Sequence, residues 1–373
     1  MLVLVTINLD FLSPIVRSVE GFSMTDIYYK IQNGEDEVQQ ESDMITLVDM
    51  TELTSRKDIA ILIQEVKALK PKVLGIDIIF EGFISDGDGD EQLAEVCLDM
   101  DSVNMVWAYK LTDYDDSRQS YLRSVHSFFI TPEEQDEGFV NIIQGPNKSV
   151  KKYAISLPYK DTIAYSLPAR IAQITIDSMY ANCETFHTID YKPVFFPVVK
   201  HDELDDFRDL ITDHIVLMGA IQEERDKYYT PIGQLSGLEI LAYTINSITS
   251  KNPLRYASNW VIFLWALLSG YIINIVDFLF TRKIRKNNTV LMLFFTRSKL
   301  YNKFITFIVM ALITWVSFEL YAKEKYFVDT VLALSTVILI TEGRLLYIGL
   351  LSVLKKHTKW KWVNNSIYNT ELE

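Results

Sequence analysis

Long apolar runs set the last third of the chain apart from the rest. Residues 260–280, 304–321 and 326–351 are each long enough, or nearly so, to cross a hydrocarbon core of roughly 30 Å as a helix. The preceding residues carry shorter periodic runs that are separated by polar segments. The sequence therefore predicts a folded domain over 20–250, a linker over 251–259 and three transmembrane helices.

Basic residues predict how these helices are oriented. The segment 282–303 carries seven basic residues and no acidic one, and four lysines lie in the tail, 352–373. Segments rich in Lys and Arg stay in the cytoplasm. With three spans, everything before Trp260 then lies on the outer side. We expect a bacterial cytoplasmic (inner) membrane protein whose large domain is extracytoplasmic.

Within the domain, β-rich runs alternate with helical periodicity. Residues 45–49 and 73–80 predict strands, and 56–69 between them places its apolar positions on one helical face. This order predicts a βαβ unit whose two strands are parallel neighbours. The domain is expected to be α/β, with a mainly parallel central sheet and helices on both faces. Further helices are predicted at 91–100, 162–180 and 237–249, and further strands at 103–109, 186–197 (as a pair) and 215–219.

The first nineteen residues form a separate apolar segment. Residues 1–16 are apolar but are interrupted by Asp10 and Pro14, and they lack the basic start of a secretory signal peptide. Two interpretations stay open: residues 1–19 are the remnant of a first span, or they form an apolar strand that packs in the domain.

Charge is divided unevenly along the chain. Residues 258–373 hold 14 basic and 7 acidic side chains, whereas residues 1–257 hold 22 and 42. An acidic domain repels phosphate backbones, which disfavours nucleic acid as a partner. Cys97 and Cys183 both lie in the domain, where they could form a disulfide or be buried singly, and the sequence leaves both alternatives open.

Two aspartates stand where predicted strands end. Asp49 closes the first strand and Asp77 lies near the end of the next. In open α/β sheets the carboxyl edge of the strands is where ligands bind. The pair could therefore line a pocket for a cation or a polar ligand; alternatively, each carboxylate caps the turn or helix that follows.

The stretch 215–246 carries a second set of candidates. A buried strand is followed by a polar loop, a Pro/Gly-containing turn and the start of the final helix. This loop either lines a ligand site or only fastens the last helix to the sheet. The residues concerned are Asp226, Thr230, Pro231 and Glu239.

Metal and catalytic signatures are weak in this sequence. Residues 86–91 resemble the start of a calcium loop, but Glu91 stands where glycine is needed and Cys97 where a bidentate glutamate is needed. We expect no metal site and no cofactor. The histidines are expected to be structural or surface residues: His126, His187, His201, His214 and His357.

Several of these motifs together resemble the type-2 CHASE domain, an extracytoplasmic sensory domain of bacterial cyclases, histidine kinases and protein kinases. The resemblance implies a ligand-binding sensory domain and adds Arg56 to the candidate residues. Leu241 departs from it, since the family often has histidine there. Lys151 and Lys152 stand near the place where an arginine often follows Gly-x-x-Asn. The matching elements are 45–49, Arg56, 75–80, Asp90, 138–141, 215–219, Asp226, 230–233 and 237–242.

The third apolar run contains two ionisable residues, Glu342 and Arg344. Two positions apart on a helix, they point to nearly opposite sides and cannot pair with each other. Each either reaches the membrane interface or contacts a partner helix, and the second alternative makes them signalling candidates.

The function expected from these features is that of a membrane-anchored sensor. It would bind an unknown small-molecule or envelope signal and relay it to a separate signalling protein, since only about a dozen residues follow Lys361. We also expect a homo-oligomer. The alternatives are a metal-dependent hydrolase that uses Asp49, Asp77 and Asp226, and a structural or assembly protein of the membrane.

Overall fold

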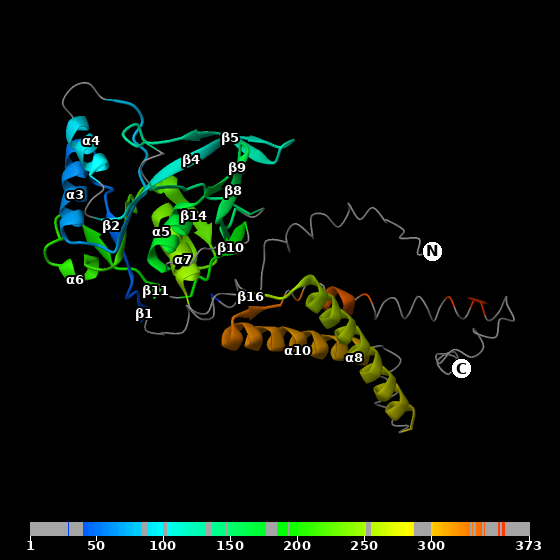
Figure 1. The fold of residues 1–373 in the computed structure, drawn as a ribbon. Coiled ribbons are helices and arrows are strands. Elements are labelled where there is room, and N and C mark those ends of the chain that lie inside the picture. The colour runs from blue at the N-terminus through cyan, green and yellow to red at the C-terminus, as the bar shows by residue number, and fades with distance from the viewer. Residues whose placement is uncertain are drawn as a thin grey trace. The chain divides into compact units, whose positions relative to one another are not determined.

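The structure is a computed structural model that divides the chain into two compact units, Met1–Pro253 and Leu254–Glu373 (Figure 1). Each unit is described by itself. The N-terminal segment 1–19 lies outside the described residues. The structure describes residues 29, 40–83, 89–99, 103–131, 136–145, 148–176, 185–192, 194–250, 255–286, 300–328, 330, 333–337, 339, 350 and 353–354.

A nine-stranded mixed sheet forms the centre of the first unit (Figure 1). Its order is β12 (Val198–Lys200), β2 (Ile45–Asp49), β13 (Ile215–Gly219), β3 (Val73–Ile76), β4 (Met105–Asp115), β5 (Ser120–Val125), β8 (Ser156–Tyr159) and β9 (Thr162–Tyr165), and β6 (Asp136–Phe139) also pairs with β4.

The sheet is parallel from β12 to β4, as the sequence predicts, but one predicted neighbour relation is wrong. Strand β13 lies between β2 and β3 and pairs in parallel with both, so the two strands of the predicted βαβ unit do not touch. Hydrophobic periodicity does not show which of these strands lies in the middle of the sheet, because β2, β3 and β13 are all fully buried apolar runs.

Beyond β4 the sheet is mixed, because β4 is long enough to pair with further strands. Beyond Tyr109, where the predicted strand ended, β4 continues to Asp115 and pairs antiparallel with β5. Residues 162–165, which the sequence assigned to a helix, form β9 in an antiparallel pair with β8. The helix α5 begins only at Leu167 and runs to Ile176. Pro168 stands in its first turn, a position that proline favours.

Helices cover both faces of the sheet (Figure 1). On one face lie α3 (Arg56–Ala68) and α4 (Asp90–Leu98), and on the other lie α5 and α7 (Gly237–Thr249). The prediction of a mainly parallel α/β domain with helices on both faces is therefore confirmed.

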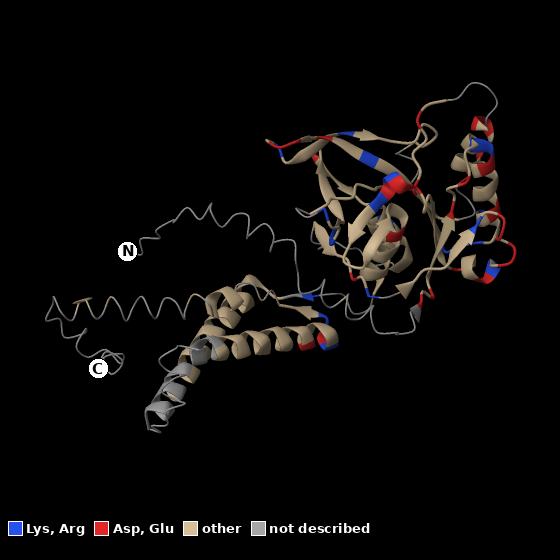
Figure 2. Cartoon of the chain, turned by 180° about the vertical axis from the view of Figure 1, so that it is seen from behind, with Lys and Arg blue, Asp and Glu red and all other residues tan. Residues whose placement is uncertain are grey.

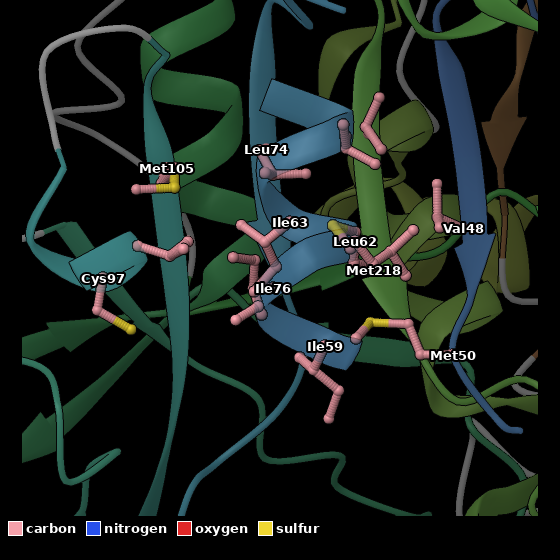
Figure 3. Packing of buried hydrophobic residues seen from close by; sticks show 14 of the residues in the cluster. Val48, Met50, Ile59, Leu62, Ile63, Leu74, Ile76, Cys97, Met105 and Met218 are labelled. Carbon is pink, nitrogen blue, oxygen red and sulfur yellow. The ribbon is translucent and has the colours of Figure 1, made fainter. Parts of the chain in front are cut away.

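Alternate residues of the central strands point to the two helical layers. Figure 3 shows Ile59, Leu62 and Ile63 of α3 against Leu74 and Ile76 of β3, all buried in one cluster. Burying each such side chain contributes about 1.5–3 kcal/mol. On the opposite face α5 approaches the sheet so closely that a Cβ added at Gly75 would lie 2.6 Å from Ile171 Cδ1.

Short strand pairs surround the sheet. The predicted pair within 186–197 is wrong: β10 (Phe186–Thr188) pairs with β7 (Lys152–Ala154), and β11 (Val194–Phe195) pairs with β1 (Gln40–Glu41). A hairpin of β14 (Lys227–Thr230) and β15 (Gly233–Ser236) precedes α7. The short helices are α6 (Arg208–Ile211) and the 3₁₀ turn η2 (Glu224–Asp226).

The second unit contains two long apolar helices, α8 (Asn259–Lys286) and α10 (Leu300–Glu324). By length and composition both could cross a membrane. Figure 2 shows few charged positions along their described lengths, in contrast to the α/β unit. Both helices extend beyond the predicted runs.

The third predicted span is tested only at its start. It was expected to begin at Tyr326, but Tyr326–Phe327 is strand β17, which pairs with β16 (Arg255–Tyr256). Residues 333–337 are helical. Most of the run that follows, including Glu342 and Arg344, lies outside the described residues.

Candidate functional site

Three strand ends meet at the carboxyl edge of the parallel sheet. Gly219, the last residue of β13, pairs with Asp49 at the end of β2. On its other side, the N–H of Asp77 donates to the carbonyl of Met218 over 2.8 Å. A Cβ added at Gly219 would lie 3.3 Å from the Asp77 Cβ. The two predicted aspartates therefore flank β13 instead of lying on adjacent strands.

The carboxylate of Asp49 accepts hydrogen bonds from other residues of the protein. Its Oδ1 accepts hydrogen bonds from the N–H of Thr51 at 3.0 Å, the Thr51 hydroxyl and the N–H of Ile221 at 3.2 Å. These bonds join the turn after β2 to the loop after β13. The arrangement matches the capping alternative for Asp49, in which the carboxylate closes a turn.

Arg56 is held in a second network, at the start of α3. Its guanidinium contacts the Asp90 carboxylate at 2.5 Å and donates to the carbonyls of Glu81 and Gly82 at 3.0 and 2.9 Å. Both charged side chains are buried. This arrangement fastens the loop after β3 to α3 and α4, and it occupies donors that a ligand would need.

Asp77 differs from both of these residues. It is half-buried, and within the described part of the chain its carboxylate makes no hydrogen bond or ion pair. Burial and the negative charge of Asp226 raise its pKa to about 7. A carboxyl group with such a pKa changes its protonation state near neutral pH.

The charge of Asp226 acts on Asp77, and the Asp226 carboxylate also contacts the start of α7. Its Oδ2 accepts the N–H of Gly237, the first residue of α7, at 3.0 Å, and it also accepts the Tyr228 hydroxyl. Burial raises the pKa of Asp226. A Cβ at Gly237 would lie only 2.5 Å from Asp226 Oδ2, so this close contact requires glycine.

Two tyrosines complete this arrangement, and the sequence did not identify either. Tyr153 of β7 is fully buried, and its hydroxyl has no hydrogen-bond partner among the described residues. Burial, with the nearby charge of Asp77, holds its pKa well above the usual range. Tyr228 of β14 has its pKa raised to about 12 by burial and by Asp226. We call Asp77, Asp226, Tyr153 and Tyr228 the aspartate–tyrosine cluster.

The backbone independently brings β7 and β14 together. The N–H of Val150 donates to the carbonyl of Tyr229 over 2.8 Å, and Ser149 forms a β-bridge with the same residue. No sequence signal marks Tyr153, because it lies far from both aspartates along the chain. Tyr228, two residues after Asp226, could have been noticed from its spacing.

The remaining candidates support the start of α7. Thr230 and Pro231 form the turn of the β14–β15 hairpin, where the Thr230 hydroxyl donates to the Gly233 carbonyl at 2.8 Å. Glu239 belongs to a capping box: its Oε2 accepts the N–H of Ser236 at 2.7 Å, and the Ser236 hydroxyl accepts the N–H of Glu239. Of the predicted set, only Asp77 and Asp226 come together in the cluster.

A separate polar network contains His126, which the sequence placed among structural histidines. Its Nδ1 lies 2.9 Å from both oxygens of Glu137, and its Nε2 lies 2.7 Å from the Ser124 hydroxyl. The Ser124 hydroxyl is also 2.9 Å from the Tyr159 hydroxyl. The network joins β5, β6 and β8 away from the parallel sheet edge.

The described residues include only part of the acidic loop and one of the two cysteines. Residues 84–88 of the calcium-like stretch lie outside the described residues, and Asp90 begins α4, where it is buried and paired with Arg56. In the part of the chain that the structure describes, no three His, Cys, Asp or Glu side chains are grouped to hold a metal. Cys97 is buried, which raises the pKa of its thiol to about 12; Cys183 lies outside the described residues.

Comparisons with known proteins agree with the resemblance noted in the sequence. A family model described as the CHASE2 domain matches residues 2–275, which is more than half of the chain. No curated protein and no solved structure matches the chain.

Proposed function

The chain belongs to the CHASE2 domain family of extracytoplasmic sensory domains, and from this premise we propose that it is a membrane-anchored sensor. Its α/β unit receives a small-molecule or envelope signal at the carboxyl edge of the parallel strands. Helices α8 and α10 anchor it in a bacterial cytoplasmic membrane, and the response passes to a separate protein.

The charge distribution supports the proposed orientation. The 42 acidic side chains of residues 1–257 suit a soluble domain outside the cell, whereas the seven basic residues of 282–303 favour the cytoplasmic side. This segment includes the last residues of α8, residues 287–299 and the first residues of α10.

The main support for the proposed relay is one hydrogen bond between Asp226 and the start of α7. The Asp226 carboxylate holds the first N–H of α7 at 3.0 Å, so any change in the charge or contacts of Asp226 acts on the start of that helix. Helix α7 ends at Thr249, and α8 begins at Asn259. Few residues of chain therefore separate the helix that contacts the cluster from the first proposed span.

The proposal includes a second copy of this chain and a separate cytoplasmic partner. Two copies allow a shift of α7 to be transmitted as a relative movement of paired helices. The basic segment 282–303 is the surface on which the partner docks. A hydrolase has weaker support, because Asp49 and Asp226 already accept hydrogen bonds from the chain.

Crosslinking in native membranes tests the relay. A photoreactive residue at position 288, within the basic segment, should give an adduct with a different polypeptide as well as a dimer of this chain. The substitution Gly237→Ala, which forces Asp226 away from α7, should change the yield of that adduct. Ser117→Ala, in an exposed turn, should leave it unchanged. Adducts with no other polypeptide would refute the relay to a separate protein.

A further inference from the structure

We propose that the aspartate–tyrosine cluster binds the ammonium group of a small protonated amine, with Asp77, Asp226 and the Tyr153 hydroxyl as its three acceptors. This inference rests on the proposed sensory function and assigns a chemical class to the signal. Nothing in the family assignment specifies that class.

Unsatisfied hydrogen-bonding capacity is the first argument. The Tyr153 hydroxyl is fully buried and has no partner among the described residues. Asp77 is half-buried, and its carboxylate accepts no hydrogen bond from the described residues. Buried polar groups are normally paired, and an unpaired one marks a functional site or a missing ligand. A primary ammonium offers three N–H donors and no acceptor, so it matches one acceptor from each of the three residues.

Asp226 can contribute without giving up its present contacts. It accepts the Gly237 N–H and the Tyr228 hydroxyl, whereas an ionised carboxylate has about four lone-pair sites. A ligand that takes one of the others would still redistribute charge at the start of α7. This gives the amine a direct effect on the helix that the proposed relay uses.

Local charge is the second argument. The charge that acts on Asp77 is that of Asp226, whereas the charges of Glu223 and Lys110 act on Asp226. The N-terminus of α7 also faces Asp226, but Asp226 and Glu239 already complement it. The acidic domain as a whole favours the approach of cations. No cation is among the charges that act on Asp77, and a monovalent cation bound beside it would neutralise its carboxylate.

The number and type of protein groups at the cluster favour an amine over a divalent metal as its ligand. Calcium takes six to eight oxygen ligands, several of them carboxylates. The described residues bring no third carboxylate, histidine or cysteine to these two aspartates. The aromatic ring of Tyr228 beside Asp226 also suits an organic cation.

Binding should displace a proton. At pH 6 the carboxyl of Asp77 is largely protonated in the free protein, because its pKa is about 7. An ammonium ion favours the ionised form, so each binding event releases a proton. Titration calorimetry of the full-length protein with methylammonium and putrescine, in buffers of different ionisation enthalpy, measures this release. Tetramethylammonium, a cation without N–H donors, should not bind.

Two tyrosine variants provide a matched comparison. Tyr153→Phe removes a hydroxyl that has no protein partner, so the variant should fold while its amine affinity falls roughly tenfold. Tyr191→Phe removes a buried hydroxyl that donates to the Val150 carbonyl at 2.8 Å and should leave amine affinity unchanged. Asp77→Asn, which keeps the size of the side chain, should abolish both binding and proton release.

Several results would overturn the inference. These are binding of Ca²⁺ or Mg²⁺ without binding of amines, equal binding of tetramethylammonium, or affinity that Tyr153→Phe and Asp77→Asn leave unchanged. Failure to bind amines, with the crosslinked partner still present, would refute only this inference. Loss of the crosslinked partner in the native protein would refute the proposed relay instead.

Discussion

Replacing Asp77 by asparagine removes one charge from the aspartate–tyrosine cluster while keeping the shape of the side chain. In the native protein this carboxyl has a pKa of about 7, against an ordinary value of 3.8, because of burial and the charge of Asp226. The folded state therefore binds the proton more tightly than the unfolded state. The contribution of Asp77 to the free energy of unfolding is therefore largest at low pH and falls as the pH rises from about 4 to about 7.

The size of this effect follows from the shift. A rise of about three pKa units corresponds to about 4 kcal/mol at about 1.4 kcal/mol per unit. Because Asp77 is partly exposed, water reduces this cost, and we expect about 2–4 kcal/mol. At pH 8, Asp77→Asn should be more stable than the native protein by that amount. At pH 4 the two should be nearly equal, since the native carboxyl is then neutral in the folded state.

Pulse proteolysis in urea measures this difference for the α/β unit while the protein stays in its membrane or detergent. The raised pKa of Asp226 also contributes to the pH dependence. Asp226 is present in both proteins, so their difference reports the charge of Asp77 together with its interaction with Asp226. Asp49→Asn is the matched control at the same sheet edge. It weakens the acceptor for Thr51 and Ile221 and should be destabilising at both pH values.

Two results would refute this reasoning. One is a difference between Asp77→Asn and the native protein that does not change between pH 4 and pH 8. The other is an asparagine variant that is less stable than the native protein at pH 8, which would mean that the ionised carboxylate is stabilised by contacts.

Four further substitutions, of which Arg118→Ala is a control, test other parts of the fold by the same urea assay. Arg56→Ala removes the guanidinium that pairs with the buried Asp90 carboxylate and should cost about 3–5 kcal/mol, whereas Arg118→Ala, at an exposed pair, should change stability by less than about 0.5 kcal/mol. Ser236→Ala removes the cap of α7 and should cost about 1 kcal/mol. Gly138→Ala places a Cβ 2.3 Å from the α5 backbone and should cost more than Ser236→Ala. Equal losses at Arg56 and Arg118, or a neutral result at Ser236 or Gly138, would contradict these assignments.

Much of the fold could be predicted from hydrophobic spacing. The helix over 56–69 was predicted from its apolar face, and strands β2, β3 and β13 were predicted from their continuous apolar runs. These predictions succeeded because local periodicity and burial set the conformation of each element. The order of the strands could not be read in the same way. Placing β13 between β2 and β3 depends on which fully apolar strand packs in the middle, and the three runs are too similar to decide this.

The site was only partly accessible from the sequence for the same reason. Asp77 could be proposed because it lies near the end of a predicted strand, and Asp226 because it lies in the polar loop that follows another. Tyr153 could not, because it reaches the cluster through the pairing of residues 149–150 with Tyr229, a long-range contact without a local signature. Arg56 matched the family pattern, but its packing against Asp90 could be recognised only in three dimensions.

The central claim is that the acidic α/β unit faces outward and the basic segment faces the cytoplasm. Labelling with a membrane-impermeant maleimide tests it in intact spheroplasts that carry Cys183→Ser, where the remaining Cys97 is buried. Ser117→Cys, in an exposed turn of the α/β unit, should be labelled, and Asn288→Cys should be labelled only after permeabilisation. Labelling of position 288 but not of position 117 in intact spheroplasts would contradict the account.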